Sequence, residues 1–226
     1  MKEYIAYKGS EFTIEWYHDV NGKSPALDHF KNQREDKQRQ LLKLLRLMGE
    51  HGKIFDETKF RNEGDKIYAF KPQPDRYLCF FFKGKKIILT NAFTKKAQKL
   101  PRGEKELALK AYQSYEKELR REPIMKKKSK STYEKFIKNK KQKRLLDSEY
   151  RELLISELLL ATMEEDHISV RKLAAEASVS PTIVQSLKTG KKTNITIDTL
   201  SRILDVVGYQ IILAPKSGSG KQLKMA

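Results

Sequence analysis

The chain has 226 residues, with 47 Lys and Arg against 29 Asp and Glu, and its formal net charge is +18. Charged residues make up 34% and hydrophobic residues 38%, which is typical of folded modules and excludes a wholly disordered chain. No apolar run reaches the roughly 20 residues that a membrane helix needs, and the start MKEYIAYKGSEF lacks the apolar core of a secretory signal. We therefore expect a cytoplasmic protein of two domains with no membrane partner.

The positive charge is unevenly distributed along the chain. Residues 1–123 carry 27 basic and 18 acidic groups, residues 124–144 carry 10 and 1, and residues 145–226 carry 10 and 10. Lys and Arg bind polyanions because they neutralise phosphates and release condensed counterions. The pattern indicates a nucleic-acid partner and a basic linker or arm, partly helical, in the middle of the chain.

The residue pattern of the first half predicts a strand, two helices, three strands and a helix, in that order. A strand is expected within residues 4–17, and Ser24-Pro25 opens a helical hairpin that runs through Met48 and is ended by Gly49 and Gly52. Three β-rich runs follow, at 66–71, 77–83 and 86–93, separated by turn residues. Pro101 begins the last helix. The only cysteine, Cys79, lies in the apolar run YLCFFF and is expected in the core, so neither a disulfide nor a cysteine-based zinc site is expected. We also expect no other metal and no cofactor.

The second half reads as helices. Asp147 is expected to cap a leucine-rich helix that ends near residue 163, and further helices are expected over 169–176, 180–188 and 197–207. The fold class is thus α+β with two domains, a small antiparallel sheet with flanking helices followed by an all-α helix-turn-helix domain. The expected boundaries are 1–123 for the first domain, 124–146 for the basic linker, 147–215 for the second domain and 216–226 for a flexible tail.

A helix-turn-helix carries the case for DNA binding. In SVRKLAAEASVSPTIVQSLKTGKK, Leu173 and Ala174 point inward, Ala177 is small where two helices approach, and Val179, Ile183 and Leu187 fill the angle. Ser180 and Pro181 open the second helix. The residues expected to face DNA are Ser180, Thr182, Gln185, Ser186, Lys188, Lys191 and Lys192. A buried helical pair with no DNA role is the alternative, because residues 145–226 carry no net charge.

Residues 169–213 resemble the Cro/repressor-type helix-turn-helix of HigA-like antitoxins, including the pattern ITIDTLSRILDVVGYQI. The resemblance implies binding to palindromic operator DNA as a homodimer.

Basic residues mark the ends of the predicted strands in the first half. Lys71 closes the first strand of the three, Arg76 opens the second, and Lys95 and Lys96 follow the third. Because alternation in a twisted sheet can bring such side chains onto one concave face, the sequence predicts a phosphate cradle.

The runs IYAFK and DRYLCFFFKGKKIILTNAFTKKAQKLP resemble the phage-derived, HigB-like branch of the RelE/ParE toxin superfamily. Phe93, Lys95, Lys96 and Pro101 match its pattern, whereas Lys71 stands where an Arg is usual and no catalytic His is evident. The resemblance implies cleavage of mRNA on the ribosome by attack of a 2′-hydroxyl on the adjacent phosphate.

The catalytic residues are then expected to be Lys71, Arg76, Lys95 and Lys96, with Tyr68 stacking on a base. For each lysine the alternative is a solvated side chain, and for Tyr68 it is packing. For the whole chain, we expect an mRNA endoribonuclease toxin held in contact with its own operator-binding antitoxin half. Two alternatives stay open: a DNA-binding repressor whose toxin-like half is silent, and a ParE-like inhibitor of a topoisomerase.

Overall fold

The computed structural model describes residues 3–95, 101–121, 130–190, 195–213 and 223–225. The chain forms two compact units, Met1–Tyr150 and Arg151–Ala226. The expected two-domain α+β class is confirmed, and the division between the units falls inside a helix that begins in the first unit and ends in the second.

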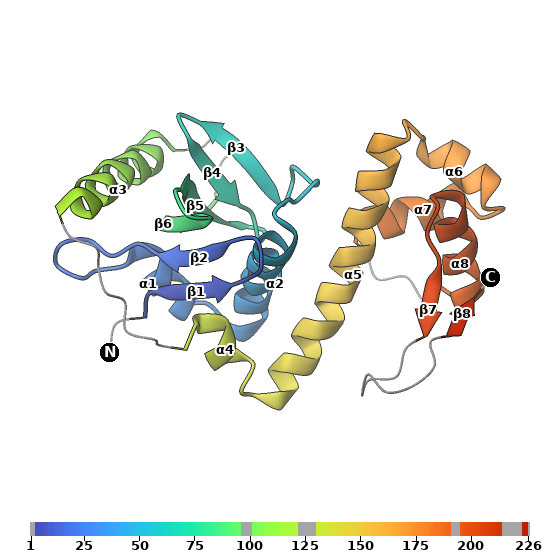
Figure 1. Cartoon of the computed structure of the whole chain (residues 1–226), viewed down its shortest axis with the longest axis horizontal. Coiled ribbons are helices and arrows are strands. Elements are labelled where there is room, and N and C mark those ends of the chain that lie inside the picture. Colours follow the sequence, from blue (N-terminus) through green and yellow to red (C-terminus); the bar gives the residue numbers. More distant parts are fainter. Residues whose placement is uncertain (1–2, 96–100, 122–129, 191–194, 214–222, 226) are drawn as a thin grey trace. The chain divides into compact units, whose positions relative to one another are not determined.

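A six-stranded mixed sheet forms the centre of the first unit (Figure 1). Its strands are β1 (Ile5–Lys8), β2 (Thr13–Trp16), β3 (Phe60–Gly64), β4 (Ile67–Phe70), β5 (Asp75–Phe82) and β6 (Lys86–Thr94), in the spatial order β1-β2-β6-β5-β4-β3. All neighbours pair antiparallel except β2 and β6, which are parallel. Where one strand was expected in residues 4–17, the chain forms the β1-β2 hairpin.

The edge strand β3 was not predicted. Its sequence, FRNEG, is polar and shows no apolar alternation, because as an edge strand it pairs only with β4 and none of its residues is fully buried. The strand was missed because a two-residue period is visible only where one face of a strand is buried.

Helices cover both faces of the sheet. On one face, α3 (Arg102–Arg121) packs Ala108, Ala111 and Tyr115 against side chains such as Leu78 and Phe80. The other face meets α1 (Pro25–Lys31) and α2 (Glu35–His51), whose leucines are buried. Residues of β5 therefore alternate between the α3 face and the α2 face of the sheet.

The two glycines near the end of α2 have different roles. Gly52 caps the helix in the left-handed conformation, with φ of 74°. Gly49 lies inside the helix, so the expectation that it ends the helix was wrong. A Cβ at Gly49 would lie 2.5 Å from the Tyr7 ring, so glycine is needed there because β1 passes close by.

The basic segment after α3 is largely helical where the structure describes it. It forms α4 (Thr132–Phe136), which has a complete capping box with Ser131 and Glu134, and the first turns of α5 (Lys140–Glu165). Asp147 lies within α5, so the expectation that it caps a helix was wrong. Its carboxylate instead accepts a hydrogen bond from Arg46 of α2 at 2.9 Å.

Residues 131–150, which we call the docking segment, pack on α2 and β1 within the first unit. Trp16 Nε1 donates to Thr132 Oγ1 at 2.8 Å, and the Thr132 hydroxyl also contacts Glu3. The ring of Tyr133 packs edge-on against that of Tyr7, with centroids 4.8 Å apart. These contacts lie on the α2 side of the sheet, because Trp16 packs against Phe30 of α1.

Charged side chains of α2 bind the docking segment. Arg46 Nη1 donates to Asp147 and also, at 3.1 Å, to the Tyr133 hydroxyl, and its guanidinium lies 4.0 Å from the centre of the Tyr150 ring. Arg39 Nε donates to Glu149 Oε1 at 2.9 Å. Because these groups are partly shielded from solvent, their attraction is stronger than that of exposed ion pairs.

The second unit is a small helical core with a two-stranded sheet. Its elements are the end of α5, α6 (Val170–Glu176), α7 (Pro181–Lys188), α8 (Ile197–Val206), β7 (Ile211–Leu213) and β8 (Leu223–Met225). Leu173, Ala174 and Ala177 are buried as expected, and Val184 is the fully buried residue of α7. Val179, Ile183 and Leu187 pack around this core in partly buried positions.

Ser178 adopts a left-handed conformation in the turn between α6 and α7. Its φ is 53°, its side chain is exposed, and its carbonyl accepts a hydrogen bond from Arg202. Non-glycine residues seldom adopt this region, because Cβ then crowds the backbone.

We predict that Ser178→Gly stabilises the second unit by about 0.5–1 kcal/mol, because relief of this strain exceeds the entropy that glycine adds to the unfolded chain. Ser178→Val should destabilise it, since a β-branched residue tolerates positive φ least. Amide hydrogen exchange in residues 170–190, measured for each variant, gives the change in the free energy of unfolding of the second unit. Equal stability of the two variants would contradict the prediction.

We predict that Arg46→Ala lowers the unfolding free energy of the first unit by about 1–2 kcal/mol, because Asp147 and Tyr133 lose a charged partner that is 28% exposed. Arg34→Ala, at the N-cap of α2, is the matched control, since Arg34 is 82% exposed and pairs with Asp36. Urea unfolding of both variants provides the comparison, and an equal loss in the two would refute the assigned role of Arg46.

Candidate functional site

The turn between β4 and β5 brings two basic residues together. Phe70 pairs with Tyr77, so Lys71 and Arg76 stand at the two ends of the turn. Alternation places Lys71 on the same face as Ala69, and Arg76 on the same face as Leu78, both of which pack against α3. The register of β4 and β5 therefore places the side chains of Lys71 and Arg76 on the same face of the sheet, as expected.

Lys71 is 9% exposed. Its Nζ donates to the carbonyl oxygen of Glu57 at 3.2 Å and lies 3.4 Å from Glu63 Oε1. Burial lowers the pKa of Lys71 below its ordinary value; Glu63 opposes this shift, and the neighbouring charges of Arg76 and Arg61 add to it. A lysine in such surroundings gives up its proton more readily than a solvated one.

Arg76 is 7% exposed and is held in place by the turn itself. Its Nη1 donates to the Asp75 carbonyl at 2.8 Å, and both terminal nitrogens donate to Gln73 Oε1 at 3.2 Å. Burial lowers the pKa of Arg76, and the charges of Glu63 and Asp75 oppose that shift. Because the guanidinium is oriented before any ligand arrives, it can bind a phosphate at little cost in side-chain entropy.

The remaining basic residues of the expected cradle extend from β6. The backbone N–H of Lys95 donates to the Pro74 carbonyl at 3.2 Å, so Lys95 lies beside the β4-β5 turn, and its side chain is half-exposed. Lys96 lies outside the described residues. Together, Lys71, Arg76 and Lys95 form a group of cations at one end of the sheet, which we call the basic cluster.

Tyr68 does not lie with the basic cluster. It is on the α2 face of the sheet, where its ring is nearly parallel to that of Phe60 at 5.7 Å and edge-on to that of Phe81 at 4.8 Å. In this position Tyr68 belongs to an aromatic layer rather than to the group around Lys71 and Arg76.

Sequence reasoning missed two charged residues that border the basic cluster, Arg61 and Glu63. Both belong to β3, and their charges act on Lys71. The only signal in the sequence was the polar run FRNEG, whose strand character becomes visible once it is paired with β4.

The second unit holds a helix-turn-helix. Ser180 Oγ accepts from the N–H of Thr182 at 3.1 Å and so begins α7, and Ser169 Oγ caps α6 in the same way. Of the residues expected to face DNA, Ser180, Thr182 and Gln185 are exposed, whereas Ser186 and Lys188 are half-buried. Lys191 and Lys192 lie outside the described residues.

A shallow hollow of about 500 Å3 lies where α6 begins and along α7. It is lined by Val170, Arg171, Pro181, Thr182, Gln185, Ser186 and Thr189. Small polar side chains with one arginine leave room for a base edge or a phosphate to approach the backbone of both helices. In helix-turn-helix proteins generally, the second helix of the motif is the one that enters the major groove.

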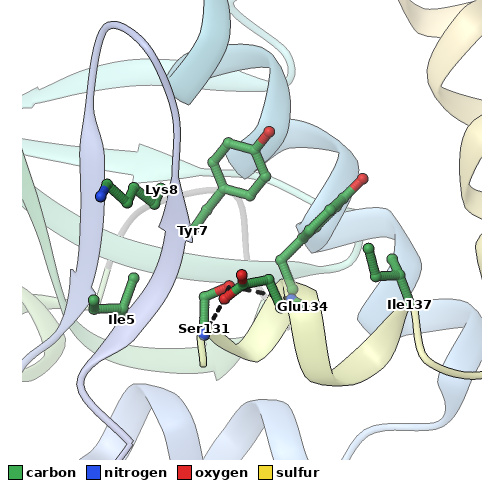
Figure 2. Close-up of a pocket in the computed structure, with 7 residues that line it drawn as sticks. Ile5, Tyr7, Lys8, Ser131, Glu134 and Ile137 are labelled. Carbon is green, nitrogen blue, oxygen red and sulfur yellow. Dashed lines mark hydrogen bonds between the residues drawn. The ribbon is translucent and has the colours of Figure 1, made fainter. Parts of the chain in front are cut away.

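A further hollow of about 420 Å3 lies in the first unit, between β1 and the docking segment (Figure 2). Lys8 and Tyr7 border it from β1, while Ser131, Glu134 and Ile137 border it from α4. The carboxylate of Glu134 is turned toward Ser131, whose N–H and hydroxyl both donate to it. Because that carboxylate completes the helix cap, the hollow is a gap in the packing of α4 on β1 and offers little polar chemistry.

Within the described ranges, no group of three or more His, Cys, Asp or Glu could hold a metal ion. In the same part of the chain, no helix is both long and apolar enough to cross a bilayer.

Comparison with protein families separates the chain in the same way. Residues 28–113 match the family described as phage derived protein Gp49-like, and residues 159–211 match the Cro/C1-type helix-turn-helix DNA-binding domain. No curated protein matches the chain. The chain therefore joins a region similar to the Gp49-like phage-derived family to a Cro/C1-type helix-turn-helix domain.

Proposed function

We propose that the chain is a type II toxin-antitoxin protein in one polypeptide. Its first unit cleaves mRNA on the ribosome, and its C-terminal half neutralises that activity and binds operator DNA as a homodimer. The observation that carries the nuclease proposal is the pairing of Lys71 with Arg76 at the β4-β5 turn, beside Lys95. RNA and DNA as partners agree with action in the cytoplasm.

The basic cluster suits cleavage by internal transfer. In this reaction the 2′-hydroxyl of a nucleotide attacks its own 3′ phosphate, and the transition state gains negative charge on the phosphate oxygens. Arg76 and Lys95, with Lys96 next to it in the chain, would bind those oxygens. Lys71, whose pKa burial lowers, would supply the proton that the leaving oxygen needs. Tyr68, on the other face, is not needed for this step.

The docking segment supports the proposal that the C-terminal half acts on the first unit. It leads into the helix-turn-helix through α5, and its side chains bind α2 and β1. These contacts are on the opposite face of the sheet from Lys71 and Arg76, so neutralisation would not require the segment to fill the basic cluster. Because both partners are in one chain, their effective concentration is roughly millimolar.

One observation favours the second candidate function, a DNA-binding repressor with a silent toxin-like domain. Lys71 and Arg76 are both less than 10% exposed, and both are hydrogen-bonded to carbonyl or amide oxygens of their own unit. In a working nuclease, RNA has to replace some of these contacts. The two functions differ in whether the chain cleaves RNA once the docking segment is released from α2.

We predict that weakening the docking segment activates the nuclease. The variant is the full chain with Asp147→Lys and Glu149→Lys, which we call the unclasped chain; the new charges repel Arg46, Arg39 and Lys43 of α2. Its expression should arrest growth and cleave transcripts on translating ribosomes, whereas the wild-type chain should be harmless. Toeprinting of a defined mRNA on purified ribosomes measures the cuts.

Two controls define the outcome. Glu164→Lys with Glu165→Lys makes the same charge change at exposed positions near the end of α5 and should stay harmless. Adding Arg76→Ala to the unclasped chain should abolish cleavage. If the unclasped chain is folded and cuts nothing, the silent toxin-like domain is the better description; if the wild-type chain cuts equally, neutralisation in one chain is wrong.

We predict that Thr182→Ala with Gln185→Ala weakens binding to a selected operator about 30-fold or more, because each of the two lost contacts with a base edge is worth about 1–3 kcal/mol. The operator is obtained by selecting duplexes from a random pool with the full chain. Lys172→Ala, on the exposed face of α6, serves as a comparison that should weaken all duplexes alike. Unchanged affinity and sequence preference in the double variant would refute DNA reading by α7.

A further inference from the structure

Glu63 is the carboxylate that meets the basic cluster. Its Oε1 lies 3.4 Å from Lys71 Nζ, and its charge also acts on Arg76. The Glu63 side chain is 21% exposed, so it is shielded from bulk water and still reachable from outside.

The end of β3 that carries Glu63 is anchored to α3, as is the turn that follows it. Lys105 Nζ donates to the Glu63 carbonyl at 2.9 Å and pairs with Asp65 at 2.8 Å. Glu63 itself sits at an irregularity in the pairing of β3 with β4, just before Gly64, whose φ is 85°. A bulged residue leaves the regular alternation, and bulges commonly re-aim a side chain toward a site. The position of the Glu63 carboxylate is thus set by β3, β4 and α3 together.

A nuclease that works by internal transfer needs a proton acceptor as well as cations. Arginine cannot accept a proton, and a lysine that donates to the leaving oxygen cannot also be the base in the same step. Asp75, a buried carboxylate near the turn, accepts from the Thr94 hydroxyl at 2.6 Å and contacts His29, on the α2 side. Asp65 is 68% exposed and points to Lys105. Glu63 is therefore the carboxylate suited to the task.

We propose that Glu63 is the general base of the cleavage reaction, an inference that rests on the proposed function. The 2′-oxygen forms its bond to phosphorus as its proton passes to the Glu63 carboxylate. The bond between phosphorus and the 5′-oxygen of the next nucleotide breaks, and that oxygen takes a proton from Lys71. The products are a 2′,3′-cyclic phosphate and a 5′-hydroxyl. Among the described residues, the charged groups that interact with Glu63 are Lys71, Arg76 and, at its carbonyl, Lys105, and Arg61 acts on Lys71 beside it.

The test compares three forms of the unclasped chain on the same mRNA and ribosomes: unchanged, Glu63→Gln and Asp65→Asn. Glu63→Gln keeps the size and an oxygen acceptor for Lys71 but removes the base. It should slow single-turnover cleavage about 100-fold or more, leave binding to the ribosome unchanged, and abolish the fall in rate at acidic pH. Asp65→Asn removes the same charge two residues away and should cut within about threefold of the unchanged form.

The outcomes separate the two proposals. If the unchanged form cuts and Glu63→Gln cuts within about threefold of it, or keeps the acidic fall in rate, Glu63 is not the base although the nuclease stands. If both substitutions slow cleavage equally, the effect is one of local charge and the assignment to Glu63 is wrong. If no form cuts, the proposed function fails and Glu63 fails with it. Matching thermal unfolding of the three forms shows that each is folded, and a product ending in a 2′,3′-cyclic phosphate supports the proton transfers.

Discussion

The pairing of Phe70 with Tyr77 is the constraint on which the candidate site depends. Because side chains alternate across a strand, this register directs Lys71 and Arg76 to the α3 face and Tyr68 to the α2 face. A shift of one residue in either strand would separate the two cations and bring one of them into the aromatic layer around Phe60 and Phe81. The core of the first unit prevents such a shift, since Leu78 and Phe80 would lose their contacts with α3.

Two cations that are close together and largely buried are costly, and the structure shows what offsets that cost. Lys71 has the Glu57 carbonyl and the Glu63 carboxylate, and Arg76 has the oxygens of Gln73 and Asp75. These partners come from the segment before β3, from β3 and from the β4-β5 turn. In the proposed nuclease, RNA would replace some of these contacts with its phosphate oxygens, and the remaining ones would keep the two cations oriented.

The docking segment illustrates how average charge differs from local chemistry. Residues 124–144 carry 10 basic groups and one acidic group, which suggests a polyanionic partner. The contacts of the docking segment with α2, however, use Asp147 and Glu149, which follow this basic stretch in the chain and bind Arg46 and Arg39. Net charge describes the field at a distance, whereas the packing of α4 and α5 selects the few side chains that come within hydrogen-bond distance.

The sequence by itself determined the two-domain α+β class, the strands that carry Lys71 and Arg76, and the helix-turn-helix with its cap Ser180. These features depend on local signals: apolar periods, turn residues and capping side chains act over a few positions.

The tertiary structure decided the rest. It paired the polar run FRNEG as β3, and this brought Glu63 to the basic cluster. It also placed Asp147 against Arg46 rather than at a helix start, and it moved Tyr68 to the other face of the sheet. Such features depend on which strands pair, in which register and beside which helix, and contacts between distant residues set that arrangement.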